Sequence, residues 1–143
     1  MAIMPIEWGK VREYATATAA PRPAYLDDPN APIPPTFLAT VVHWSTIGET
    51  VRAPEVAEAC ASVGIEPDVR NLLSLEQEYV FHGRVPRAGE TLHNSERLQD
   101  VRIKRGRSGP MVIVRFLVSF HDAEGLLLAE CRYTSAYVRK EAS

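Results

Sequence analysis

The chain has 143 residues, of which 45% are hydrophobic and 24% are charged, and its formal net charge is −2. This length and balance predict a globular protein with a substantial core and exclude a disordered chain. The small net charge gives no indication of nucleic-acid binding, and no stretch approaches the roughly 18 consecutive apolar residues that a membrane span needs.

The first ten residues lack the basic and apolar regions of a secretory signal, so we expect a cytoplasmic protein. The two cysteines, Cys60 and Cys131, lie far apart without the spacing of metal ligands, and the four histidines do not cluster with them. This pattern predicts two reduced thiols in the core. No metal and no cofactor are predicted.

Residues 6–18 predict a short amphipathic helix, because apolar side chains recur there at steps of three and four. The segment that follows, up to Pro35, contains six of the eleven prolines. Proline interrupts both helices and central strands, so this segment is predicted to be an ordered loop. The expected apolar face of the helix consists of Trp8, Val11, Tyr14, Ala15 and Thr18.

Residues 29–48 carry no charged side chain. Within them, PTFLATVVHWSTI at residues 35–47 predicts a helix, because proline is tolerated in a first turn. A helix without charge over this length is expected to be buried on most of its circumference. The expected core side chains are Phe37, Leu38, Val41, Val42 and Trp44, and a second, more polar stripe consists of Thr36, Ala39, Thr40, His43 and Ile47.

A third helix is predicted at Pro54–Val63, and four strands are predicted after it, at residues 75–85, 91–104, 110–120 and 127–138. The last two strands give the clearest pattern, with Asp122–Gly125 as the turn between them. We therefore predict an α+β fold with helices against one face of a four-strand antiparallel meander. The buried face of the 110–120 strand is expected to consist of Val112, Val114, Phe116, Val118 and Phe120.

Four segments resemble the MaoC-like hydratases and dehydratases, in the N-terminal type of their domain. They are VREYATATAAPRPAYLDD, APIPPTFLATVVHW, EQEYVFHGRVPRAGETL and DAEGLLLAECRYTSAYV, in the order of that family. The resemblance implies a hot-dog fold, in which a curved antiparallel sheet wraps around a long apolar central helix. It covers nearly the whole chain, so residues 1–143 are expected to form a single MaoC-like domain.

The resemblance also implies a function. Members of this family bind acyl thioesters of coenzyme A or acyl carrier protein and often hydrate or dehydrate them. They act as dimers, or as two-domain chains, whose sheets join edge to edge. In active members an Asp and a His hold the water, and backbone N–H groups at the start of the central helix polarise the thioester carbonyl, where negative charge develops.

The sequence departs from the family pattern at these catalytic positions, where it has Ala20 for the aspartate and Tyr25 for the histidine. Alanine transfers no proton, and tyrosine, with a pKa of about 10, is a poor base near neutral pH. The chain therefore resembles the non-catalytic subunits of (3R)-hydroxyacyl-thioester dehydratases. We expect a homodimer, or a heterodimer with a hot-dog subunit that carries the Asp/His pair.

Two groups of candidate site residues follow from this resemblance. Arg102, Lys104, Arg105 and Arg107 gather near one turn and would contact phosphates or an acidic carrier protein, or simply form a charged surface turn. His43 is either a weak candidate for a replacement base or a satisfied buried histidine. The expected substrate-binding residues are Tyr25, Pro35, Thr36, Phe37, Thr40 and His43, with Thr36 and Phe37 as donors of backbone N–H groups.

Three other functions stay open. The first is an active enoyl-CoA hydratase that uses His43 with Tyr25. The second is a hot-dog acyl-CoA thioesterase, which the uncharged span at 29–48 disfavours because such enzymes need a carboxylate near the central helix. The third is a ligand-sensing or structural protein without chemistry. His82 is expected to be a solvated strand residue in each case.

Overall fold

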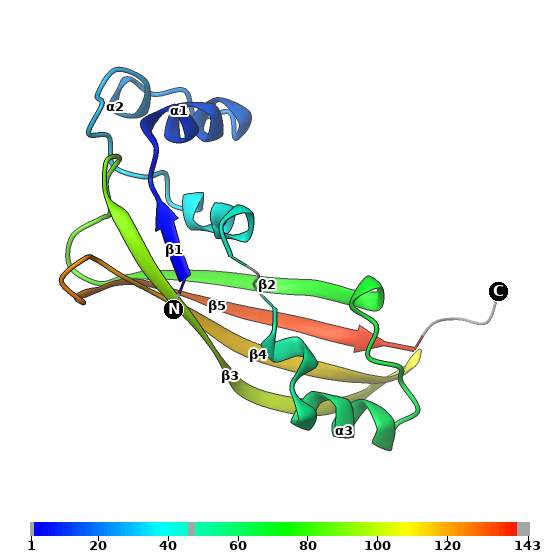
Figure 1. Cartoon of the computed structure of the whole chain (residues 1–143). Coiled ribbons are helices and arrows are strands. Elements are labelled where there is room, and N and C mark those ends of the chain that lie inside the picture. The colour runs from blue at the N-terminus through cyan, green and yellow to red at the C-terminus, as the bar shows by residue number, and fades with distance from the viewer. Residues whose placement is uncertain (1, 46–47, 140–143) are drawn as a thin grey trace. The chain divides into compact units, whose positions relative to one another are not determined.

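The computed structural model describes residues 2–45 and 48–139 (Figure 1). Its five strands form one curved sheet in the order β1-β3-β4-β5-β2. The strands are β1 (Ala2–Pro5), β2 (Leu72–Phe81), β3 (Thr91–Gly106), β4 (Gly109–His121) and β5 (Leu127–Val138). The helices are α1 (Trp8–Ala17), α2 (Pro23–Leu26) and α3 (Pro54–Ser62), with 3₁₀ helices η1 (Phe37–His43), η2 (Thr50–Arg52) and η3 (Val69–Asn71).

The central strand of the sheet is β4, as its sequence indicates. Its predicted inner face is confirmed, because every second side chain along it is buried. Leu117, on the opposite face, is buried as well, which agrees with a strand covered on much of both sides. The turn to β5 is confirmed too: Gly125 has a φ of +87°, and its N–H donates to the carbonyl of Asp122 at 3.1 Å. The buried face of β4 consists of Val112, Val114, Phe116, Val118 and Phe120.

The predicted four-strand meander is wrong in one respect. Only β3, β4 and β5 are consecutive neighbours, whereas β2 lies beside β5 at the edge of the sheet. The connection at residues 82–90 is long enough to pass the β4–β5 turn, and Arg84 in this connection contacts Asp122 of that turn at 3.3 Å. The other side of β3 is taken by β1, which pairs with it antiparallel from Ala2↔Asn94 to Pro5↔Thr91. β1 has no counterpart among the strands predicted from the sequence.

The chain forms two compact units. The first comprises residues 1–47, 79–95 and 119–130, and therefore contains η1 and all four histidines. The second comprises residues 48–78, 96–118 and 131–143. In the second unit α3 begins at Pro54 as predicted, and its inward residues Val56 and Cys60 are fully buried.

The buried interior of the second unit includes one polar contact that fixes β5. The hydroxyl of Tyr137 on β5 donates to the carbonyl of Val51 in η2 at 3.0 Å, and burial raises the pKa of this phenol. Cys60 and Cys131 form no disulfide and are fully buried, as predicted, and burial raises the pKa of the Cys60 thiol. Both thiols therefore behave as small core side chains.

The N-terminal helix α1 agrees with its predicted pattern, because Val11 and Ala15 are fully buried. The proline-rich segment after it is not a loop throughout. It contains the single helical turn α2, which begins at Pro23. Proline is tolerated there because a backbone N–H in the first turn of a helix makes no hydrogen bond within the helix. None of the helices in the described ranges has the length and apolar character that a membrane crossing requires.

The predicted central helix is shorter and wound differently. It is the seven-residue 3₁₀ helix η1, and residues 46–47, at the end of the predicted helix, lie outside the described residues. Phe37, Leu38 and Val41 are buried as expected, but Val42 is 56% exposed and Trp44 is 42% exposed. The winding explains this difference. Four residues turn a 3₁₀ helix about 120° past a full turn, compared with about 40° in an α-helix, so Val42 is carried away from Leu38.

Candidate functional site

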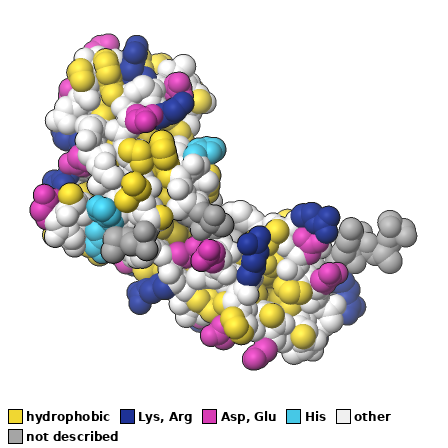
Figure 2. Space-filling view, viewed as in Figure 1, with side chains coloured by type: hydrophobic (Ala, Val, Ile, Leu, Met, Phe, Trp, Pro, Cys, Tyr) yellow, Lys and Arg dark blue, Asp and Glu magenta, His cyan; other side chains and the backbone are white. Residues whose placement is uncertain are grey.

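The first unit contains a pocket of about 460 Å³ between α1 and η1. Most of its wall is apolar, with one imidazole, two hydroxyl groups and one ion pair among the lining side chains. In Figure 2, hydrophobic side chains and a histidine lie close together on the surface of the part that contains these helices. The lining residues are Pro5, Lys10, Glu13, Tyr14, Ala17, Phe37, Thr40, His43 and Trp44.

Three of the residues expected from the sequence meet in this pocket: Phe37, Thr40 and His43. They are spaced by three, and a 3₁₀ helix has three residues per turn, so their side chains lie one above another on η1. The hydroxyl of Thr40 donates to the carbonyl of Phe37 at 2.8 Å. His43 is an exposed pocket residue, so the alternative of a buried, satisfied histidine is wrong.

Tyr14 forms the opposite wall and fixes α1 to the start of η1. Its ring meets the ring of Phe37 edge to face, with 5.5 Å between the centroids. Its hydroxyl lies 2.6 Å from Oγ1 of Thr36 and donates to the carbonyl of Thr36 at 3.0 Å. The sequence assigned Tyr14 only to a packing face. No local pattern connects it with Thr36, which is 22 residues away.

Lys10 and Glu13 form the charged part of the lining, at 2.9 Å from each other. The hydrogen bond to Glu13 raises the pKa of Lys10, so this amine stays protonated near neutral pH. The two charges offset each other, and both side chains are exposed. The pair therefore leaves the pocket largely apolar, with the imidazole of His43 and the hydroxyl groups of Tyr14 and Thr40 as its uncharged polar groups.

The remaining expected site residues do not line this pocket. Tyr25 belongs to α2, where its carbonyl accepts a hydrogen bond from the indole of Trp8 at 3.1 Å. Pro35 is exposed, and Ala20 lies between α1 and α2. The expected backbone donor at Phe37 is wrong, because its N–H already donates to the carbonyl of Pro34 at 3.0 Å.

The cationic residues of the β3–β4 hairpin lie in the second unit and do not line the pocket either. All four are exposed. Arg102 lies 3.5 Å from Asp100, whose carboxylate also pairs with Arg115 and has its pKa lowered mainly by that hydrogen bond. The four cations are Arg102, Lys104, Arg105 and Arg107.

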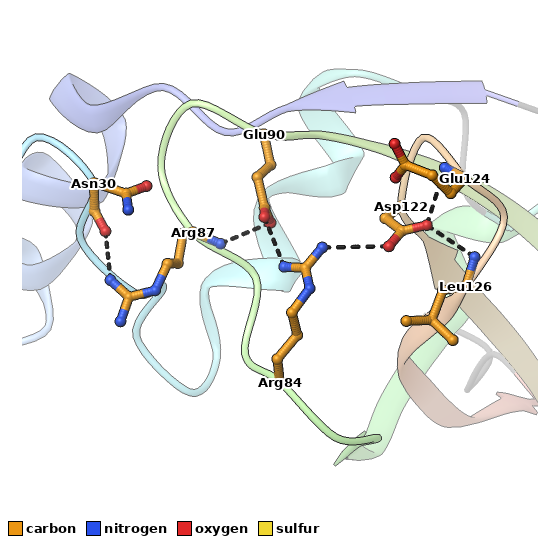
Figure 3. A network of polar contacts seen from close by, with 7 residues as sticks. All are labelled: Asn30, Arg84, Arg87, Glu90, Asp122, Glu124 and Leu126. Atoms are coloured by element: carbon orange, nitrogen blue, oxygen red, sulfur yellow. Dashed lines mark hydrogen bonds and ion pairs between the residues drawn. The ribbon is translucent and has the colours of Figure 1, made fainter.

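A polar network holds the connection between β2 and β3 in the first unit (Figure 3). Arg84 binds Glu90 at 2.6 Å and Asp122 at 3.3 Å. The other carboxylate oxygen of Asp122 accepts the N–H groups of Leu126 at 2.8 Å and Glu124 at 3.1 Å. These two backbone groups and Arg84 lower the pKa of Asp122, with the bond from Leu126 as the largest cause. Both oxygens of the Asp122 carboxylate therefore bind groups of the protein itself, and this side chain stabilises the turn.

The same network reaches the proline-rich segment. Glu90 accepts the backbone N–H of Arg87 at 3.0 Å, and the guanidinium of Arg87 donates to the carbonyl of Asn30 at 2.6 Å (Figure 3). The chain at Pro32 forms a β-bridge with Arg87. Arg84, Arg87 and Glu90 thus connect three segments that are far apart in the sequence.

His82, which directly follows β2, is partly solvated, with 40% of its side chain exposed, but it also has a specific partner that its pattern did not suggest. Its Nε2 lies 2.8 Å from a carboxylate oxygen of Glu130 on β5, and its backbone N–H donates to the carbonyl of Leu128. This pair joins β2 to β5 and does not line the pocket of the first unit. Within residues 2–45 and 48–139, no three histidine, cysteine or carboxylate side chains come together as a metal site.

A family model described as "FAS1-like, dehydratase domain region" matches residues 3–131. The chain belongs to this family. The match covers both halves of the pocket wall, α1 and η1, and extends into β5. No curated protein matches the sequence of this FAS1-like dehydratase domain.

Solved structures confirm the predicted hot-dog fold of this FAS1-like dehydratase domain. A chain of the C-terminally truncated HadBC complex, a (3R)-hydroxyacyl-ACP dehydratase from Mycobacterium tuberculosis, matches with a TM-score of 0.67 and 18% identity, over 94% of this chain and 89% of that chain. A chain of the ChsH1–ChsH2 complex from the same organism matches with a TM-score of 0.69 and 17% identity, over 98% and 86%.

A third structure, a MaoC-like dehydratase, matches with a TM-score of 0.74 and 20% identity. The match covers 98% of this chain but only 40% of that chain, so the present FAS1-like dehydratase domain corresponds to part of the longer protein.

Proposed function

We propose that this chain binds an acyl thioester of coenzyme A or acyl carrier protein in the pocket of its first unit. It would supply the substrate-binding half of a hydroxyacyl- or enoyl-thioester dehydratase whose Asp/His pair lies on a partner chain. The observation that carries the proposal is the pocket itself. The chain belongs to the dehydratase family, and its pocket has mostly apolar walls. Neither of the two residues at the family's catalytic positions, Ala20 and Tyr25, lines this pocket.

The lining suits an acyl group. Ligand pockets of about 300–1,000 Å³ are commonly apolar with a few polar groups that fix orientation, and this one has about 460 Å³. Phe37 and Trp44 provide broad apolar contact, and Thr40 and His43 provide polar contact beside them. The partial exposure of Trp44 is explained if a ligand or a partner covers it.

At this pocket the chain lacks the Asp/His pair that active members of the family use, and His43 is its one imidazole. Ala20 and Tyr25, at the family catalytic positions, do not line it, and the one lining carboxylate, Glu13, is exposed and paired with Lys10. Positioned acid–base groups typically contribute about 10²–10⁴-fold to a rate. A chain that lacks the family's acid–base pair is expected to bind substrate but to convert it only together with a partner chain that supplies this pair.

The edge strand β2 supports a partner chain. None of its residues is buried, and Leu73 and Leu75 are 50% and 51% exposed. An open edge with apolar side chains is a ready template for another strand. The HadBC and ChsH1–ChsH2 structures are complexes of two different chains, which favours a catalytic hot-dog subunit over a second copy as the partner.

The test compares the chain alone with the chain co-expressed with hot-dog proteins encoded beside it. Alone, it should bind crotonyl-CoA by calorimetry but not hydrate it. With a partner that carries an intact Asp/His pair, hydration should appear. Absence of binding by the chain alone and in the complex would exclude the proposal.

A second candidate function is an enoyl-thioester hydratase that needs no partner, and the position of His43 in the pocket favours it. In that case the chain alone would hydrate crotonyl-CoA, and His43→Ala would abolish turnover. The matched control is His93→Ala, which removes another histidine of the same unit that does not line this pocket. Loss of turnover in both variants would indicate unfolding rather than catalysis by His43.

A further inference from the structure

The β3–β4 hairpin carries a concentrated positive charge on a chain whose net charge is −2. Four cations lie within six residues, and all four are exposed. Among the described residues, Arg102 has an acidic neighbour, Asp100, which it shares with Arg115, whereas Lys104, Arg105 and Arg107 form no ion pair. The charge of this hairpin, which we call the cationic hairpin (residues 101–109), is therefore available to a partner.

The arrangement of these cations does not suit a small anion. Successive side chains of a strand point to opposite faces, so Arg102 and Lys104 lie on one face and Arg105 on the other. None of them lines the pocket described above. A phosphate group is held by donors that converge on it, commonly a bidentate arginine and backbone N–H groups. Cations spread over both faces of an exposed hairpin instead match the many carboxylates of a broad protein surface.

An apolar side chain lies among the charges. Ile103 is 44% exposed and, by the alternation of the strand, lies on the same face as Arg105. Protein interfaces commonly combine an apolar centre with a polar, charged rim, and the cationic hairpin offers both. A nucleic-acid surface would use the cations but would leave the isoleucine without a contact.

We infer that the cationic hairpin is the docking surface for an acidic carrier protein that delivers the acyl group as a thioester. This inference rests on the proposed function, in which the thioester is carried either by coenzyme A or by acyl carrier protein, and it decides between the two. Because the cations are exposed, they act mainly by steering the carrier protein, so the association depends strongly on salt.

The test uses the full chain and two probes, crotonyl-CoA and a purified bacterial acyl carrier protein loaded with a crotonyl group. The variant is Arg105→Glu with Arg107→Glu, which reverses two charges at the tip. The matched control is Arg22→Glu with Arg52→Glu, which makes the same charge change at two exposed arginines outside the hairpin. Thermal unfolding of both variants verifies that they are folded.

The wild-type chain should bind both probes. The hairpin variant should bind the loaded carrier protein about tenfold more weakly and crotonyl-CoA with unchanged affinity, whereas the control should bind both as the wild type does. Raising the salt concentration from 0.05 to about 0.5 M should weaken carrier-protein binding by the wild type and have little effect on the hairpin variant.

Three results would overturn the inference. Unchanged carrier-protein affinity in the hairpin variant would show that the cations serve another purpose, such as guarding the exposed edge of β3, while the proposed function would stand. An equal loss of affinity for both probes would place coenzyme A at the hairpin instead. Failure of the wild type to bind either probe would contradict the proposed function, and the docking inference with it.

Discussion

The hydroxyl of Tyr14 lies 2.6 Å from Oγ1 of Thr36 and donates to the carbonyl of the same residue at 3.0 Å. Tyr14 belongs to α1, and Thr36 directly precedes η1, so this contact joins the two walls of the pocket. The edge-to-face contact between Tyr14 and Phe37 lies beside it. The shape of the pocket therefore depends on one side chain that belongs to the N-terminal helix.

Tyr14→Phe should loosen this wall without removing its ring. Loss of the hydrogen bonds should destabilise the chain by about 0.5–1 kcal/mol, because they are partly exposed to water. The affinity for crotonyl-CoA should fall by roughly two- to fivefold, because the start of η1 is less well fixed. Denaturant unfolding and calorimetric titration would measure both effects.

Tyr25→Phe is the matched control, since it removes the hydroxyl of a tyrosine that contributes only its carbonyl to the contact with Trp8. We expect this variant to keep the stability and affinity of the wild type. If it lost affinity while Tyr14→Phe did not, the family catalytic position would be part of the site and the pocket between α1 and η1 would not be.

The strands could be predicted from the sequence because alternation depends only on neighbouring residues. Val112 and Phe120 lie eight residues apart on the same face of β4, and both are buried, which the pattern alone predicts. The Asp122–Gly125 turn follows from equally local chemistry. In each case, the interaction that fixes the conformation lies within a few residues of the pattern that predicts it.

Long-range pairing could not be predicted in this way. The position of β2 beside β5 depends on the crossing at residues 82–90, which Arg84 fixes through Glu90 and Asp122. The winding of η1 was also missed, because an uncharged run with proline at its start fits a 3₁₀ helix as well as an α-helix. The pattern alone predicted the α+β class, and the family resemblance, which covers nearly the whole chain, added the hot-dog fold.

The candidate site was predicted only in part, because its two walls come from segments that are far apart in the sequence. Phe37, Thr40 and His43 share one segment, which the family resemblance assigned to the substrate site, although the predicted pattern placed Phe37 on the core face and the other two on the polar stripe. Tyr14 and the Lys10–Glu13 pair come from α1, and only the tertiary fold places them opposite η1. Trp44 was expected in the core and forms part of the pocket wall instead.

Trp44 provides a direct optical test of the pocket. The chain has two tryptophans. Trp8 does not line the pocket, and its indole N–H donates a hydrogen bond to the carbonyl of Tyr25. In Trp8→Phe, the tryptophan emission comes from Trp44 alone, and it should shift to shorter wavelength when crotonyl-CoA covers the indole ring. In the reciprocal variant Trp44→Phe, the emission of Trp8 should stay unchanged. A shift confined to the reciprocal variant would place the ligand elsewhere.

Asp122 should make the fold sensitive to acid. Its pKa in the folded chain is lowered by Leu126, Glu124 and Arg84, so the charged form stabilises the fold above the unfolded pKa of about 3.9. This contribution is lost as the pH falls through the folded pKa. Asp122→Asn should therefore be less stable than the wild type at pH 7, and the difference should close below about pH 4.

Denaturant unfolding between pH 3 and pH 7 would measure this difference. The control is Asp27→Asn at an exposed carboxylate beside α2, which should follow the wild type over the whole range. A stability difference for Asp122→Asn that stayed constant with pH would show that the charge of Asp122 contributes nothing and that shape alone fixes the turn.

The edge strand β2 should determine assembly. Leu75→Lys places a charge on the open edge, where lysine disfavours the addition of a further strand. After co-expression with a hot-dog partner, size-exclusion chromatography with light scattering should show a complex of the two chains for the wild type and separate chains for Leu75→Lys. Leu126→Lys is the matched control, because it exchanges the same residue types at a 58% exposed leucine in the β4–β5 turn, outside β2. If both variants kept the assembly of the wild type, the partner would dock on a different surface, and the argument from the exposed leucines of β2 would be wrong.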